Sequence, residues 1–66
     1  MIPAYVANNL GKLKLQRTIH SLTASRVAEA LGVSTATFYD YENGNSMPER
    51  RIYNRLAMLF SWEVWK

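Results

Sequence analysis

The feature that most constrains this 66-residue chain is a glycine set between two short stretches of helical periodicity. Gly32 follows the small residue Ala28 by four positions. A glycine can end a helix in the left-handed backbone conformation at little cost, and a small side chain lets two helices approach closely. Apolar residues occur at the spacing that would fill the wedge between the helices: Val27, Leu31, Val33, Phe38 and Tyr41. This pattern predicts two short helices that meet at a sharp corner over residues 24–43.

The ends of these two helices carry their own signals. Thr23 is the expected N-cap of a helix over residues 24–31, and Gly32 is expected to end it. Ser34 is the expected N-cap of the next helix, which runs to about Glu42. Because each helix has a start signal and a stop signal, the two are predicted as separate elements joined by a tight turn.

Helical periodicity also predicts the elements around the corner. A first helix is expected from Pro3 or Asn9 to His20, and another after Pro48. Residues 61–66 could add a short fifth turn. No stretch alternates apolar and polar residues for long enough to suggest a strand. The sequence therefore predicts an all-α domain of four to five helices over its full length.

The composition excludes several ways of stabilising so small a chain. Cysteine is absent and His20 is the single histidine, so neither a disulfide nor a zinc site is expected. Stability must come from helix packing or a dimer. No catalytic set, phosphate-binding glycine loop or metal cluster appears, which predicts a protein that is not an enzyme and uses no cofactor. The net charge of +3 fits a polyanionic partner, and the lack of a membrane-length apolar run fits a cytoplasmic protein.

Several short segments resemble one family of regulators. They are LT at residues 22–23, VAEALGVS at 27–34, YENG at 41–44, Pro48, and LA at 56–57. Over residues 10–62 the chain resembles the XRE, or Cro/C-repressor, family of lambda-type helix-turn-helix proteins. The resemblance implies a compact lambda-repressor-like domain that binds an operator in double-stranded DNA, usually as a dimer. It also implies an ion pair between Arg17 and Glu42 that fixes the third helix, with a second role for the arginine at a phosphate.

If the third helix enters the major groove, its outward side chains meet the edges of bases. The candidate base contacts are Thr35, Ala36, Tyr39 and Asp40. The candidate phosphate contacts are Ser25, Ser34, Asn43, Asn45, Arg50 and Arg51. Four of these candidates have a plainer alternative: helix initiation for Thr35, surface packing for Tyr39, and a solvated face for the two arginines.

Three departures from the family pattern keep other functions open. Ala24 stands where the family usually has a phosphate-binding Gln, Asp40 where Arg or Lys is common, and Gln16 where an apolar residue is usual. A carboxylate near phosphates is repulsive, although it can accept from a cytosine amino group. The leading hypothesis is a sequence-specific transcription regulator of a phage, plasmid or mobile element. The alternatives are an antirepressor-like module that binds another regulator, and the antitoxin of a toxin–antitoxin pair.

The aromatic residues after residue 60 suggest a second interface. Trp62 is expected to cover the core, as an apolar residue does at that family position. Val64 and Trp65 are either a homodimer contact or further core packing, because so small a domain can rarely bury two terminal tryptophans. A weak homodimer would double the number of contacts to DNA.

Overall fold

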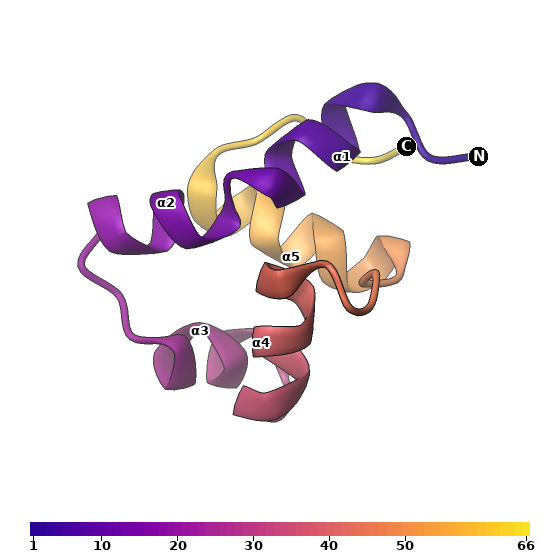
Figure 1. Ribbon diagram of the computed structural model, residues 1–66. Helices are drawn as coiled ribbons and strands as arrows, with labels where there is room; N and C mark the ends of the chain where they lie inside the picture. The colour runs from indigo at the N-terminus through magenta and orange to yellow at the C-terminus, as the bar shows by residue number, and fades with distance from the viewer.

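A computed structural model describes all 66 residues and shows five helices and no strand (Figure 1). The helices are α1 (Ala4–Gly11), α2 (Leu13–Ile19), α3 (Ala24–Leu31), α4 (Thr35–Asn43) and α5 (Arg50–Phe60). The two ends of the chain lie close together at one side of the molecule (Figure 1). The prediction of an all-α fold with four to five helices is confirmed.

The corner between α3 and α4 forms where the sequence predicts it. Gly32 has φ 76° and ψ 28°, the left-handed conformation, and the Val33 N–H donates to the Ala28 carbonyl at 3.0 Å. The Thr23 hydroxyl accepts from the Arg26 N–H at 3.2 Å and starts α3. The Ser34 hydroxyl accepts from the Thr37 N–H at 3.1 Å and starts α4. These local bonds make α3 and α4 two separate helices.

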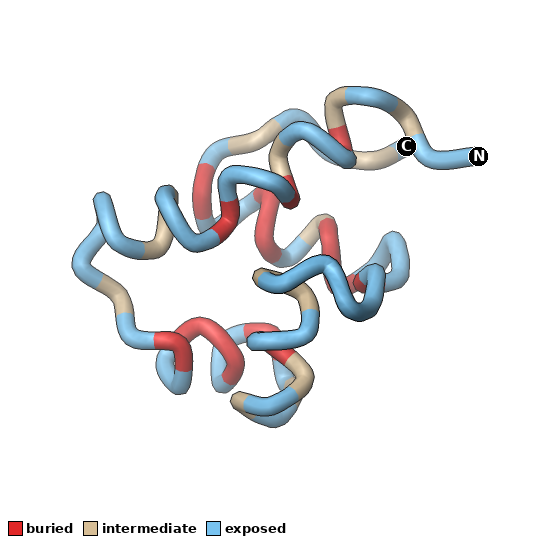
Figure 2. The backbone as a smooth tube through the Cα atoms, viewed as in Figure 1, coloured by how far each residue is buried: buried red, intermediate tan, exposed pale blue.

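The hydrophobic core receives side chains from all five helices but unequally (Figure 2). Its members are Val6, Leu10, Leu13, Ala24, Val27, Ala28, Leu31, Phe38, Ile52, Tyr53, Leu56, Ala57 and Phe60. Helices α3 and α5 each bury a whole face, whereas α4 buries Phe38 alone. Helix α4 is therefore held to the core mainly by Phe38, with Tyr41 packed beside it on the same side, and its opposite face is free.

The expected first helix is two helices. The chain breaks at Lys12, where φ is −101° and ψ is 7°, and the Lys12 N–H donates to the Asn9 carbonyl at 3.0 Å. That bond spans three residues instead of four, so the turn is tighter than an α-helical one. Gly11 stands directly before the break and lowers helix stability by about 1 kcal/mol relative to Ala. A continuous helix to His20 was therefore the wrong prediction.

The expected fifth helical turn is absent. Residues 61–66, called the tail below, leave α5 through Ser61, which has φ 59° and ψ 41°, and run without helix back along α1 (yellow in Figure 1). The backbone carbonyls of the tail accept hydrogen bonds from side chains of α1 and α5 instead of from the tail itself. Trp62 does cover the core, with its ring 5.8 Å from that of Tyr53 and 5.3 Å from that of Phe60.

Candidate nucleic-acid interface

The outer face of α4 is an exposed strip of side chains three and four residues apart. Ala36, Tyr39 and Asp40 are exposed, with 47% of Tyr39 accessible, and Thr35 is half-buried at the start of the helix. Phe38 is completely buried on the opposite side. Residues three or four apart share one helix face. The four candidate base-contacting residues thus lie together at the N-terminal and central turns of α4.

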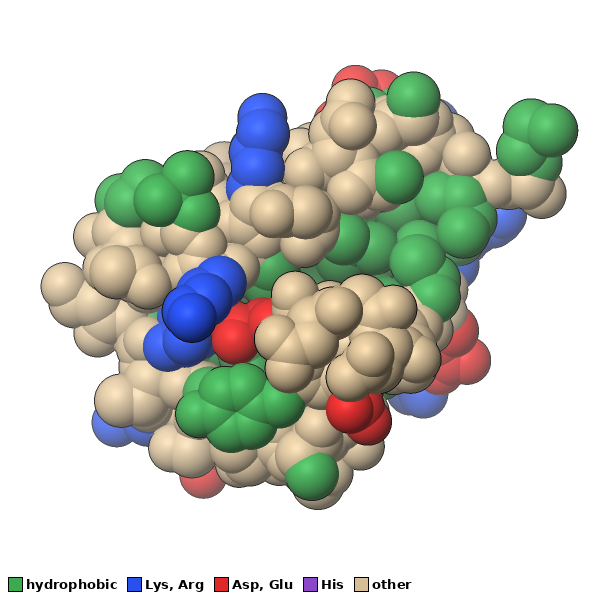
Figure 3. Space-filling view, in the orientation of Figure 1, with side chains coloured by type: hydrophobic (Ala, Val, Ile, Leu, Met, Phe, Trp, Pro, Cys, Tyr) green, Lys and Arg blue, Asp and Glu red, His purple; other side chains and the backbone are tan.

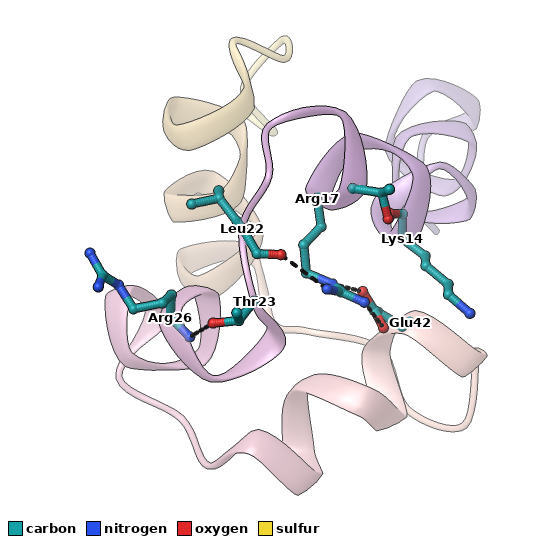
Figure 4. Close-up of polar contacts among 7 residues, drawn as sticks. Lys14, Arg17, Leu22, Thr23, Arg26 and Glu42 are labelled. Atoms are coloured by element: carbon teal, nitrogen blue, oxygen red, sulfur yellow. Dashed lines mark hydrogen bonds and ion pairs between the residues drawn. The ribbon is translucent and has the colours of Figure 1, made fainter.

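An ion pair fixes the C-terminal end of α4 against α2 (Figure 4). The Arg17 Nε donates to Glu42 Oε2 at 2.6 Å, and its Nη1 donates to the Leu22 carbonyl at 3.0 Å. The two side chains are only 15% and 3% exposed. The hydrogen bond to Glu42 raises the pKa of the Arg17 guanidinium above its ordinary value, with a smaller contribution from Tyr39. Arg17 therefore remains charged and offsets one of the two carboxylates of α4.

Lys14 joins this region although the sequence analysis did not select it. It lies three residues before Arg17 on α2, is exposed, and extends beside Glu42 (Figure 4). The spacing of Lys14 and Arg17 places them on one face of a helix, but only the packing of α2 beside α4 brings that face to the candidate site. Lys14 thus adds a free positive charge near the C-terminal end of α4 (Figure 4).

The candidate phosphate contacts at the helix ends are all exposed. Ser25 lies in the first turn of α3, where its hydroxyl is 3.3 Å from that of Thr23. Ser34 caps α4 and also donates from its hydroxyl to Thr37 Oγ1 at 2.9 Å. Asn43 ends α4, and Asn45 follows in the loop, where its N–H donates to the Asp40 carbonyl at 2.9 Å. Ser34, Asn43 and Asn45 thus lie at the two ends of α4, whereas Ser25 lies at the start of α3.

The two arginines at the start of α5 are held differently. Arg51 Nη2 lies 2.9 Å from Glu49 Oε1, and both side chains are more than 60% exposed. An ion pair this exposed contributes at most about 1 kcal/mol, so Arg51 can leave it for a phosphate. The Arg50 guanidinium instead lies over the ring of Trp65, 5.2 Å from its centroid.

The basic side chains near α4 belong to neighbouring helices. Helix α4 contains Asp40 and Glu42 and no lysine or arginine. The space-filling view shows basic and acidic side chains next to each other on the side of α2 and α4 (Figure 3). Asp40 makes no ion pair and is the one uncompensated carboxylate on α4. The candidate interface is therefore a polar helix face bordered by basic side chains.

The candidate dimer residues lie in the tail. Val64 is 41% exposed. Trp65 is half-buried and meets the ring of Tyr53 edge-on at 6.0 Å, so much of its indole contacts its own chain. The structure therefore gives Val64 a free side chain and Trp65 an intramolecular place.

Two other features are absent from the structure, a metal-ligand cluster and a membrane-length helix. No three His, Asp or Glu side chains come together closely enough to hold a metal ion. None of the five helices has the length and apolar content that a membrane span requires.

Comparison with known proteins agrees with this geometry. A family model described as a helix-turn-helix domain matches residues 9–61, which include the corner, the Arg17–Glu42 pair and all of α5. No curated protein and no solved structure gave a significant match. The matched segment covers most of the chain. The chain therefore belongs to the helix-turn-helix domain family, is of the XRE/Cro type, and has an all-α, lambda-repressor-like fold.

Proposed function

We propose that this protein is a sequence-specific transcription regulator that places α4 in the major groove of an operator. The observation that carries the proposal is the one-sided anchoring of α4, which buries Phe38 and leaves Ala36, Tyr39 and Asp40 in solvent. The major groove is about 12 Å wide and admits an α-helix. Because the corner at Gly32 and the Arg17–Glu42 ion pair hold both ends of α4, the helix would enter the groove as a rigid element.

The side chains of the outer face suit pyrimidines. The methyl groups of Thr35 and Ala36 can pack on a thymine methyl, and the Asp40 carboxylate can accept from a cytosine amino group. Helix α4 carries no arginine or lysine for the bidentate contact to guanine. Tyr39 can donate through its hydroxyl to a base or a phosphate. The expected operator therefore presents thymine and cytosine on the strand that faces α4.

Contacts to phosphates would come from the residues around this face. Lys14, Arg50 and Arg51 would supply the free positive charge, and Arg17, although paired with Glu42, would add a contact through its remaining N–H groups. The candidate hydrogen-bonding contacts are Ser25, Ser34, Asn43 and Asn45. Each phosphate neutralised by a lysine or arginine releases counterions, so the affinity should fall steeply with salt.

A weak homodimer would complete this function. One copy offers a single short recognition helix with few strong base contacts, and two linked copies read two half-sites with a higher effective affinity. The proposed contact is Val64, with its exposed side chain, together with the part of the half-buried Trp65 ring that its own chain leaves uncovered. Sedimentation velocity at micromolar concentration should show a monomer–dimer equilibrium that Val64→Asp shifts to monomer. A parent protein that stays monomeric with and without operator DNA would contradict the dimer.

Selection from a random duplex library tests the function directly. The bound sequences should share a short motif, and fluorescence anisotropy with that duplex should show tight binding at 50 mM salt and much weaker binding at 200 mM salt. Changing Thr35 and Tyr39 together to alanine should abolish specific binding, whereas Met58→Ala, an exposed change on α5, should not. Asp40→Asn should move the preference at one position from cytosine to adenine, because an amide pairs with adenine. No enriched motif, or an unaltered motif for Asp40→Asn, would contradict the proposal.

A second candidate function rests on Ala24. This residue is buried at the start of α3, so it offers no group to a phosphate, and Asp40 repels one. These features favour a module of the same fold that binds another regulator, as an antirepressor does, or the antitoxin of a toxin–antitoxin pair. Failure to bind any duplex at any salt concentration, together with recovery of one defined regulator or toxin, would favour this candidate over the first.

A further inference from the structure

The tail is fastened through its backbone at residue 65. The Asn54 side-chain amide makes two hydrogen bonds there: its Nδ2 donates to the Trp65 carbonyl at 3.0 Å, and its Oδ1 accepts from the Trp65 N–H at 2.7 Å. A single planar amide thus satisfies both backbone groups of one residue. This arrangement fixes the position and direction of the backbone that carries the indole ring of Trp65.

Two tyrosines fasten the residues just before it. The Tyr5 hydroxyl donates to the Val64 carbonyl at 2.9 Å, and the Tyr53 hydroxyl donates to the Glu63 carbonyl at 3.3 Å. The Tyr53 ring also meets the Trp65 ring edge-on. Because the backbone is held at three successive residues and the ring packs on a completely buried tyrosine, the indole has a defined orientation.

Arg50 stacks on the Trp65 ring and keeps its hydrogen-bond donors free. Its guanidinium lies over the Trp65 ring and makes no hydrogen bond or ion pair in the structure. Arg17 donates to Glu42 and Leu22, Arg51 donates to Glu49, and Arg55 donates to the Leu31 carbonyl. Stacking on an aromatic face fixes the guanidinium plane while its N–H groups, which point outward in that plane, stay available. Arg50 is thus oriented and unoccupied.

We propose that Trp65 is a positioning residue that orients Arg50 for a phosphate of the bound DNA. The proposal rests on the proposed function, in which Arg50 is a phosphate contact. An arginine already held in one orientation loses less side-chain freedom when it binds, and that saving appears as affinity. Removing the ring while keeping the arginine should weaken DNA binding about three- to tenfold.

The test is a double-mutant cycle with the selected duplex. Trp65→Leu, Arg50→Gln and the double variant are compared with the parent by anisotropy at two salt concentrations. Trp65→Leu should weaken binding threefold to tenfold in the parent and should add almost nothing when Arg50 is already Gln. Trp65→Phe, which keeps an aromatic face under the guanidinium, should restore most of the affinity. Thermal melting of each variant confirms that it is folded at the assay temperature.

A spectroscopic measurement gives an independent readout. In a Trp62→Phe background Trp65 is the single tryptophan, and its fluorescence should change when DNA engages Arg50. The same titration of the Arg50→Gln variant should show a much smaller change. A role for Trp65 in folding alone would not make this signal depend on Arg50.

Every other outcome of these experiments contradicts either this inference alone or the proposed function as well. Equal losses from Trp65→Leu with and without Arg50, or no loss at all, would overturn the proposal while DNA binding by the parent keeps the proposed function intact. Unchanged affinity of the Arg50→Gln variant would also overturn it, because Arg50 would then touch no phosphate. Absence of binding by the parent to every selected duplex would overturn the proposed function, and this inference with it.

Discussion

The corner over residues 24–43 and the tail over residues 61–66 are stabilised by opposite means. The hydrogen bonds that set the helix ends at the corner join residues close in sequence, such as Ser34 to Thr37, and its helices then bury apolar side chains. The Arg17–Glu42 pair and the bond from Arg55 to the Leu31 carbonyl then fasten the corner to α2 and α5. The tail is held by hydrogen bonds from side chains of α1 and α5 to its backbone, and its two tryptophan rings are only partly buried. Local backbone chemistry sets the shape of the corner, whereas the tail takes its shape from the rest of the fold.

The two regions should therefore respond very differently to substitution. Burial of a large apolar side chain contributes several kcal/mol, while a satisfied hydrogen bond contributes about 1 kcal/mol net. A domain of this length has a total stability of only about 3–10 kcal/mol. Damage to the corner should unfold the protein, and damage to the tail should release a segment from a folded domain.

The largest effect on stability is expected at Phe38, which holds α4 to the hydrophobic core. Phe38→Ala should reduce the free energy of unfolding by about 3–5 kcal/mol, because a completely buried ring is lost and a cavity remains. Urea denaturation followed by circular dichroism measures this loss. The neighbouring change Tyr39→Ala, on the exposed side, should cost about 0.5 kcal/mol or less. Similar losses for the two variants would show that α4 does not have one buried side.

The next effect concerns the ion pair that joins the corner to α2. Glu42→Gln should cost about 3 kcal/mol, because it leaves the Arg17 guanidinium without its anionic partner in a largely buried site. Glu49→Gln, in the exposed pair with Arg51, is the matched control and should change stability by about 0.5 kcal/mol at most. Chemical denaturation at neutral pH distinguishes the two. Equal losses would mean that burial has no influence on these pairs.

Alanine substitution at two glycines should change the stability of the protein in opposite directions. Gly32→Ala should destabilise the protein by about 1–2 kcal/mol, because its φ of 76° is unfavourable for any residue with a Cβ. Gly11→Ala should instead stabilise it by about 0.5–1 kcal/mol, because Gly11 is helical and its added methyl would meet open space. Thermal melting gives both values. A stabilising Gly32→Ala would contradict the left-handed turn on which the corner depends.

The smallest effect should come from the tail. Asn54→Ala removes both hydrogen bonds to the Trp65 backbone and should cost about 1 kcal/mol of global stability. Amide hydrogen exchange should show a much larger local change, with protection lost at the Trp65 N–H and retained in α3. Asn45→Ala, a loop change away from the tail, should leave that protection unaltered. Protection that survives Asn54→Ala would mean that other contacts hold the tail.

This difference also explains what the sequence could predict. The helix ends at Thr23, Gly32 and Ser34 follow from residue types and their immediate neighbours. The corner, and which residues of α4 face outward, could therefore be predicted from the sequence. The family resemblance added the Arg17–Glu42 pair, which joins residues 25 positions apart. The roles of the outward residues in DNA binding remain predictions.

The errors lie where distant contacts decide the structure. Gly11 weakens the helix beside residue 12, but a lone glycine does not require the tight turn that separates α1 from α2. The tail is extended because side chains such as Tyr5 and Asn54, far away in sequence, bind its backbone. Lys14 was missed for the same reason, since its proximity to Glu42 depends on how α2 packs beside α4.

The way α4 is held has a consequence for how such a protein can change. The side chains at positions 36, 39 and 40 are exposed and take no part in the contacts of Phe38, Tyr41 and Glu42 that hold the helix, so they can be exchanged with little penalty to folding. A laboratory library restricted to these positions would therefore contain mostly folded members. If these positions read DNA as proposed, a gene duplicate could acquire a new operator through a few surface substitutions. The domain would then be a scaffold for retargeting, in which different residues encode the choice of DNA sequence and the stability of the fold.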